Sequence, residues 1–172
     1  LTLIVGPSKT SRAVGATKEH LAERYDFRQR FSEGLLARAR QKTNLHTNVS
    51  PSYSNWISTG AGKTGVSYAY VIRQHDAHVE FYIDPPVDEQ NPERRVAKEM
   101  FDVLHRRREE IEGTFGEPLE WQQLEAKWAC RIKLQIDQGG YRDEARWSSI
   151  YDSLIEAMIR LEKAFKPHIP LL

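Results

Sequence analysis

Hydrophobic and polar positions alternate in four stretches of this chain and recur at helical spacing in three others. The alternation predicts four strands, at about residues 65–74, 77–84, 119–124 and 129–137. The helical spacing predicts three helices, at about residues 17–42, 92–116 and 143–165. A tight turn at His75-Asp76 joins the first two strands into a hairpin, and the last two strands form a second hairpin. Each hairpin has one apolar face. The expected fold is therefore α+β, a four-stranded antiparallel sheet from two hairpins with helices mainly on one face.

The first sixteen residues differ in character from the rest. Residues 1–16 begin with an apolar run and then contain Gly6-Pro7, two serines and Gly15, a composition typical of a linker or an edge strand from a preceding segment. Thr17 is the expected N-cap of the first helix, and residues 17–172 are expected to form a single domain. Because the chain starts without Met, we expect an upstream domain of the same protein.

Composition narrows the class of protein. No apolar run approaches the ~18 residues of a membrane span, so no membrane partner is expected. The single cysteine, Cys130, excludes an internal disulfide, and with no signal peptide the expected location is cytoplasmic. Residues 1–75 carry 11 Lys and Arg against 4 Asp and Glu, a net charge of +7 in a chain of net charge +1. A basic half can attract a polyanion, or the two halves can neutralise each other in the fold.

A Gly-Lys-Thr sequence at residues 62–64 resembles a phosphate-binding loop. Such a loop needs a glycine five positions before the glycine of Gly-Lys-Thr, where this chain has Ile57. It also needs a helix directly afterwards, whose amides hold the phosphate, whereas β-branched and aromatic residues from Val66 onward predict a strand. The nucleotide-binding hypothesis therefore fails twice.

A metal-dependent nuclease is one remaining catalytic alternative. Glu125 and Lys127 match the Glu-x-Lys half of a PD-(D/E)XK core, and Asp84 ends a predicted strand. Two carboxylates could hold Mg²⁺ while the lysine orients a water. That core also needs a parallel strand, which the pattern does not predict. His75 and His78 bracket a turn, but two ligands are too few for a metal site, and no metal or cofactor is expected.

The leading hypothesis is a non-catalytic accessory domain that binds DNA. Basic side chains on the first helix would contact phosphates, and aromatic residues of the loop at 43–59 would stack on unpaired bases. The candidates are Arg24, Arg28, Arg38, Arg40, Lys42, Tyr53, Trp56 and Lys63. The alternative is a dimerisation or interaction module that uses the last helix or an exposed sheet face.

Several short sequences together resemble a prokaryotic family of domains of unknown function. They are residues 56–65 (WISTGAGKTG), 79–84 (VEFYID), 109–112 (EEIE), 115–121 (FGEPLEW) and 165–167 (FKP), with Phe101, Arg131-Ile132 and Trp147. The resemblance covers about residues 18–169. It implies a domain that commonly lies C-terminal to a PD-(D/E)XK nuclease-like half, so that any nuclease chemistry would lie upstream. It implies no established activity.

Overall fold

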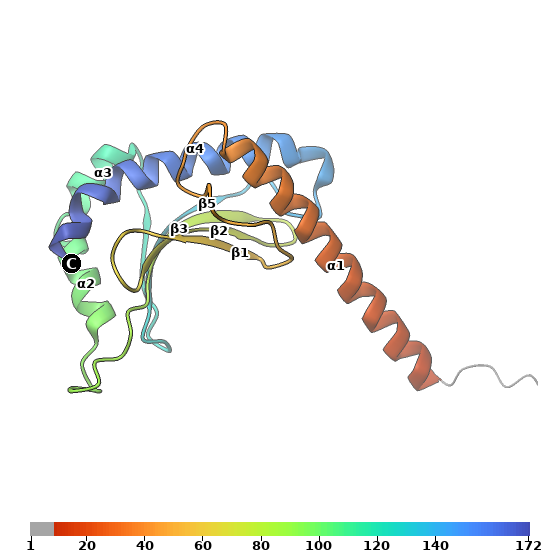
Figure 1. Cartoon of the computed structure of the whole chain (residues 1–172), viewed down its shortest axis with the longest axis horizontal. Helices are drawn as coiled ribbons and strands as arrows, with labels where there is room; N and C mark the ends of the chain where they lie inside the picture. The colour runs from red at the N-terminus through yellow and green to blue at the C-terminus, as the bar shows by residue number, and fades with distance from the viewer. Residues whose placement is uncertain (1–8) are drawn as a thin grey trace, which may run out of the picture.

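Five antiparallel strands form one open sheet in the spatial order β1-β2-β3-β5-β4 (Figure 1). The computed structural model describes residues 9–172, with side chains from residue 13 onward. The strands are β1 (Trp56–Gly60), β2 (Val66–Ile72), β3 (Ala77–Ile83), β4 (Glu120–Gln123) and β5 (Cys130–Ile136). The two predicted hairpins, β2-β3 and β4-β5, are confirmed, and β3 pairs with β5 to join them.

Helices cover one face of this sheet (Figure 1). They are α1 (Lys9–Ala39), α2 (Val96–His105), α3 (Arg108–Phe115) and α4 (Trp147–Phe165), with short 3₁₀ helices at η1 (Glu144–Arg146) and η2 (Lys166–Leu171). Trp121 of β4 contacts both Phe101 of α2 and Phe165 of α4, so these two helices lie on the same side of the sheet. The prediction of helices mainly on one face is confirmed.

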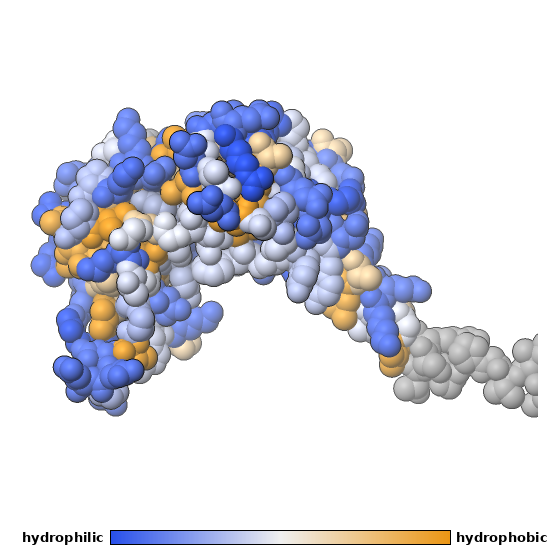
Figure 2. Space-filling view, viewed as in Figure 1, coloured by the Kyte–Doolittle hydropathy of each residue, from blue (hydrophilic) through white to orange (hydrophobic). Residues whose placement is uncertain are grey.

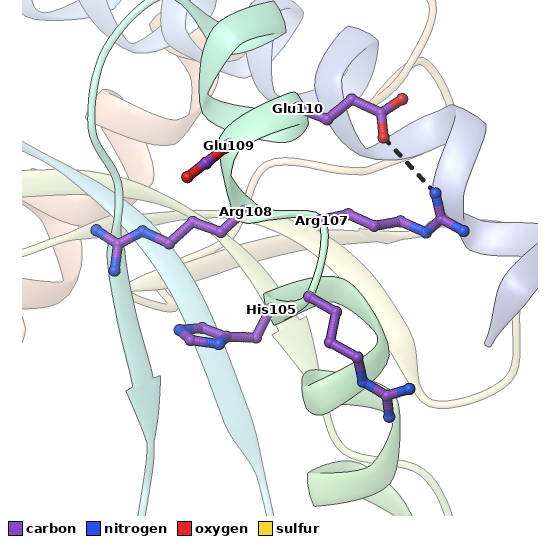
Figure 3. Close-up of a pocket in the computed structure, with 6 residues that line it drawn as sticks. His105, Arg107, Arg108, Glu109 and Glu110 are labelled. Carbon is purple, nitrogen blue, oxygen red and sulfur yellow. Dashed lines mark ion pairs between the residues drawn. The ribbon is translucent and has the colours of Figure 1, made fainter.

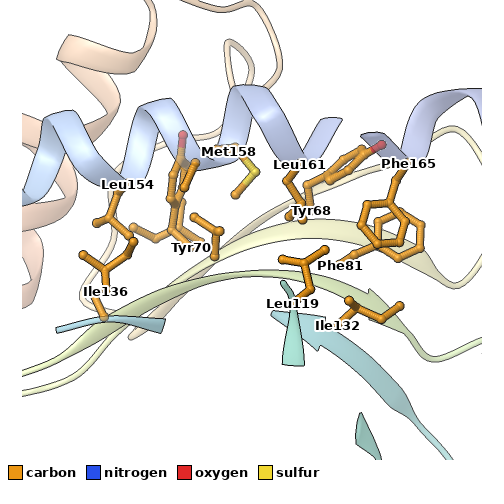
Figure 4. Close-up of a cluster of buried hydrophobic side chains, with 14 of the residues drawn as sticks. Tyr68, Tyr70, Phe81, Leu119, Ile132, Ile136, Leu154, Met158, Leu161 and Phe165 are labelled. Atoms are coloured by element: carbon orange, nitrogen blue, oxygen red, sulfur yellow. The ribbon is translucent and has the colours of Figure 1, made fainter. Parts of the chain in front are cut away.

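The hydrophobic core lies between α4 and the central strands. Leu154, Met158, Leu161 and Phe165 project from α4 toward the sheet (Figure 4) and are completely buried. The rings of Phe165 and Phe81 stack with centroids 4.4 Å apart. The predicted apolar side of the last helix is therefore the surface that organises the fold, because apolar residues three and four positions apart lie on one side of a helix.

The prediction for the N-terminal residues is wrong in part. Residues 9–16, expected to belong to a linker, are the first turns of α1, and residues 1–8 lie outside the described part. Thr17 is not an N-cap, because its hydroxyl donates to the carbonyl of Ala13 one turn earlier, at 2.9 Å, inside the helix. Gly15 costs a helix roughly 1 kcal/mol relative to Ala, which is too little to end one of 31 residues.

The predicted sheet lacked one strand. Residues 56–60, assigned to a polar loop, form β1 and pair with β2. Ile57 is buried, while the serine and threonine that follow it gave the segment a loop-like composition. The prediction of four strands is therefore corrected to five, with β1 at the edge.

The predicted helix at 92–116 is two helices. Asp88 accepts hydrogen bonds from the backbone N–H groups of Gln90 and Asn91, which holds the expected helix start in a turn. The helix then breaks at Arg107, whose φ of −111° and ψ of 19° depart from helical values. The break lets α2 pack on the sheet and α3 pack on α4. Gly116, with φ of 100°, ends α3 as expected.

The glycine-rich segment at 60–65 connects β1 to β2. It leads into a strand, as the sequence predicts, and Gly62 and Gly65 have φ of 88° and 77°. The backbone of Pro85 lies so close to Gly65 that an added Cβ would fall 2.2 Å from the proline Cα. Gly60, at the other end of the segment, has open space around its Cβ position.

We expect Gly65→Ala to lower the free energy of unfolding by more than about 2 kcal/mol, because positive φ and overlap with backbone both oppose a methyl group. Gly60→Ala is the matched control and should change stability by less than about 1 kcal/mol. Urea denaturation followed by circular dichroism measures both. Equal midpoints for the two variants would contradict the close packing at Gly65.

His46 is buried against the ring of Tyr70, with ring centroids 4.7 Å apart. Burial lowers the pKa of His46 to about 4. The unfolded chain takes up this proton near pH 6.5, so it binds more protons than the folded chain between these values. Stability should therefore fall as the pH decreases from about 7 to about 4.

Replacing His46 with Gln should remove this part of the pH dependence, about 3 kcal/mol across the whole window at about 1.4 kcal/mol per pKa unit. Urea denaturation at a series of pH values measures the slope. His20, whose side chain is 79% exposed, provides the control, and His20→Gln should leave the slope unchanged. A wild-type slope retained in His46→Gln would exclude this residue as its source.

Candidate functional site

No helix of residues 9–172 packs on the sheet face opposite α4 (Figure 1), and we call it the open sheet face. Its side chains alternate with those of the core along each strand. They include Trp56, Ala69, Val71, His78, Glu80, Tyr82, Arg131 and Lys133. Figure 2 shows that the underside of the molecule is hollowed between the projecting part of α1 and the opposite limb that contains α2. The open sheet face borders this hollow.

A cavity of about 370 Å³ lies on the open sheet face. Trp56, Tyr82 and Arg131 line it from three different strands, and Asp84 and Lys127 line it from beyond the strand ends. The indole of Trp56 meets the Tyr82 ring at 74°, with centroids 5.7 Å apart. Two aromatic rings, two cationic side chains and the carboxylates of Glu80 and Asp84 therefore share one concave surface.

A buried carboxylate lies at the centre of this surface. Glu80 is 3% exposed and accepts hydrogen bonds from the Trp56 indole Nε1 at 2.9 Å and from His78 Nε2 at 3.2 Å. Arg131 approaches the same carboxylate to 4.0 Å. Burial acts to raise the pKa of Glu80, but the bonds from His78 and Trp56 and the charge of Arg131 outweigh it and hold the pKa below its usual value. The Glu80 carboxylate is thus ionised, and each of its two oxygens accepts a hydrogen bond.

Tyr82 is the second ring of the cavity. Burial raises the pKa of its phenol, and the nearby carboxylates of Asp84 and Glu80 raise it further. The phenol is therefore neutral at physiological pH. It offers a flat ring and a hydroxyl group and no acid–base function there.

Part of the basic surface predicted for the first helix is paired inside the fold. The helix ends at Ala39 and not at Lys42, so Arg40 and Lys42 lie in the turn that follows α1. Arg38 and Lys42 both pair with Asp152 of α4, at 2.9 and 3.2 Å. Arg40 donates to the carbonyl of Val49. The acidic second half of the chain thus supplies the counter-charge for Arg38 and Lys42, while Arg40 is held by a backbone carbonyl.

Arg24 and Arg28 differ from these residues, because neither forms an ion pair with an acidic side chain among the described residues. Arg24 lies over the ring of Tyr25 and Arg28 over that of Tyr141, at 5.5 and 5.2 Å. The Nε of each arginine is buried and has no hydrogen-bond partner within residues 13–172. Tyr53 stacks against Tyr25 with centroids 5.1 Å apart. Three of the predicted nucleic-acid contacts are therefore neighbours.

This group lies at the same end of the sheet as Trp56. Tyr141, beneath Arg28, donates its backbone N–H to the carbonyl of Arg73, which directly follows β2. The last residue of β2 bonds to the carbonyl of Asn55, which precedes Trp56. Lys63 is the exception, because it lies at the far end of β1 and donates to the carbonyl of Leu172.

The structure shows only part of the geometry that a metal-dependent nuclease would need. Asp84 and Lys127 do line the same cavity, but Glu125 lies exposed in the turn between β4 and β5. Every strand pairing is antiparallel. Across residues 9–172 no three His, Cys, Asp or Glu side chains gather as metal ligands.

A larger cavity, of about 490 Å³, lies at the break between α2 and α3. Its lining contains Arg106, Arg107 and Arg108. Figure 3 shows Arg107 and Arg108 pointing in opposite directions, and they pair with Glu110 and Glu112 respectively. Side chains that diverge do not converge on one anion, so this cavity is not the candidate site.

The sequence pattern does not predict Glu80, Tyr82 and Arg131 as parts of a site, and it offers His78 only as a partner of His75 at a turn, where the structure places it on Glu80. Alternation places Glu80 and Tyr82 on the polar side of their strand, which predicts side chains that face solvent. The signal that could have found them is a histidine, an acid and a tyrosine at alternate positions of a central strand, since charged residues are rarely buried without partners.

The fold belongs to the α+β class with an open antiparallel sheet covered on one face. The chain belongs to the family described as Domain of unknown function (DUF4268), which it matches over residues 27–169. No curated protein and no solved structure matches it. None of the helices in the described part is long and apolar enough to cross a membrane.

Proposed function

We propose that this chain is a non-catalytic accessory domain that binds single-stranded nucleic acid in the hollow beside the open sheet face. One observation carries the proposal: Trp56 and Tyr82 present aromatic rings beside Arg131 on a sheet face that no helix in the described part of the chain covers. Aromatic rings on a concave, partly cationic surface stack with unpaired bases. Trp56 is 40% exposed and accessible to such a base.

Two features beyond the cavity support the proposal. Arg24 and Arg28 lie on α1 at the end of the sheet where Trp56 lies, and they make no ion pair with an acidic residue in residues 13–172, so their guanidinium groups can pair with phosphates. Tyr53, three residues before β1, stacks on the Tyr25 ring that Arg24 also contacts, and it adds an exposed aromatic ring. In this interpretation the bound single-stranded nucleic acid runs from the open sheet face to α1.

The wider setting rests on the family resemblance. We infer a prokaryotic, cytoplasmic protein in which this domain accompanies a PD-(D/E)XK nuclease-like half and supplies it with nucleic-acid affinity. Cys130, buried and unpaired, agrees with a reducing compartment.

The test is fluorescence anisotropy of labelled single-stranded and duplex DNA at several salt concentrations. We expect the single strand to bind more tightly, because stacking requires unpaired bases. Trp56→Ala should weaken binding about tenfold, since stacking contributes ~1–3 kcal/mol per base. Arg24→Glu with Arg28→Glu should weaken binding and flatten its dependence on salt.

Trp128→Ala is the matched control for Trp56→Ala. Trp128 is also 40% exposed, but its ring is occupied by the guanidinium of Arg95, 3.8 Å away. Its removal should change affinity less than about twofold. Absence of binding at about 50 mM salt, or equal effects of the two tryptophan variants, would reject the proposal.

Self-association is the second candidate function, and exposed apolar side chains on α1 support it. Val14 and Leu21, seven residues apart on one side of this helix, are 50% and 36% exposed. The same side of α1 carries Leu35 into the core. Static light scattering should then give a mass that rises with concentration above 19.9 kDa, and Leu21→Glu should return it to that of one chain. A constant monomer mass excludes this function.

A further inference from the structure

Trp56 occupies a position where its side chain would ordinarily be free to move. It is the first residue of β1, which pairs only with β2 and forms one edge of the sheet. Its indole ring nevertheless lies across the open sheet face, because Nε1 donates to Glu80 Oε1 at 2.9 Å. Glu80 belongs to β3, and β2 separates the two strands. Ala69 of β2, which pairs with Glu80, is 0% exposed.

The acceptor of this bond is held from several sides. Its other oxygen, Oε2, receives the bond from His78 and faces Arg131. The backbone of β3 is paired on both sides, with β2 and with β5. A carboxylate with so many partners has one position, so it fixes the orientation of any group that bonds to it.

We propose that Glu80 is a positioning residue, which holds the Trp56 ring ready to stack and makes its contact independent of base sequence. The inference rests on the proposed function. The indole has one hydrogen-bonding group, its N–H, and Glu80 engages it inside the protein. The exposed part of the ring is then purely a π surface, which every base can match. The ligand class is an unpaired strand of any sequence.

A first consequence concerns ligand choice. Oligonucleotides of dT, dA and dC of equal length should bind with affinities within about threefold of one another, because stacking strength alone distinguishes them. Glu80→Leu should reduce affinity for each of them about tenfold. Glu80→Gln keeps an oxygen that can accept the indole N–H and should stay within about threefold of wild type.

A double-mutant cycle separates positioning from a merely structural role. Trp56→Phe keeps a ring but cannot make the bond. In that background Glu80→Leu should change affinity less than about twofold, since no bond remains to be lost. An equal loss in both backgrounds would show that Glu80 acts on the fold, and would overturn the inference. Thermal melting of each variant checks that it is folded.

The indole N–H signal of Trp56 gives a readout that needs no ligand. The chain has 4 Trp residues, so four such signals are expected in a ¹⁵N correlation spectrum, and Trp56→Phe identifies one by its loss. Glu80→Leu should shift this signal and speed its exchange with water, while Glu80→Gln should preserve its protection. An unchanged signal in Glu80→Leu would disprove the bond. A changed signal in a protein that binds no oligonucleotide would confirm the bond and reject the nucleic-acid function.

Discussion

The packing of α4 across the sheet is the interaction on which the other features depend. Phe165 stacks on Phe81, and Leu154, Met158 and Leu161 cover the tyrosines of β2. This contact buries the apolar side chains of all the central strands, and residues of α1 and α2 complete the core at its edges. The opposite side of the same strands is then not needed for the core. It can carry Trp56, Tyr82 and Arg131 in an arrangement that a fully covered sheet would not allow.

Charge has two separate roles in this molecule. The basic first half and the acidic second half neutralise each other where α1 meets α4, through Asp152 with Arg38 and Lys42. Such half-exposed pairs contribute little to stability. Their importance lies in removing positive charge from that surface. Arg24 and Arg28, by contrast, make no ion pair with an acidic residue in the described part of the chain, and they lie at the end of the sheet where Trp56 lies. Positive charge therefore remains on this part of α1.

The strands and the last helix could be predicted from sequence because their apolar residues follow one period without interruption. The edge strand could not, since Ile57 is the only side chain of β1 that is fully buried, and one buried residue gives no period. The break at Arg107 was equally hidden, because α2 and α3 together keep a nearly helical spacing of apolar residues. For the site, composition drew attention to many basic residues, but only the fold shows which lack a counter-charge. Glu80 was missed because burial of a polar strand position depends on neighbours that are distant in sequence.

The closeness of Gly65 to Pro85 has a further consequence for how this sequence can vary. The segment between β1 and β2 cannot easily change in length, because Gly65 at its end packs directly against the backbone of Pro85. Removing or inserting one residue there would exchange the inward and outward positions of β1. Ile57 would then leave the core and Trp56 would enter it. The length of residues 61–65, which resemble a nucleotide-binding loop, thus determines on which face of the sheet Trp56 lies.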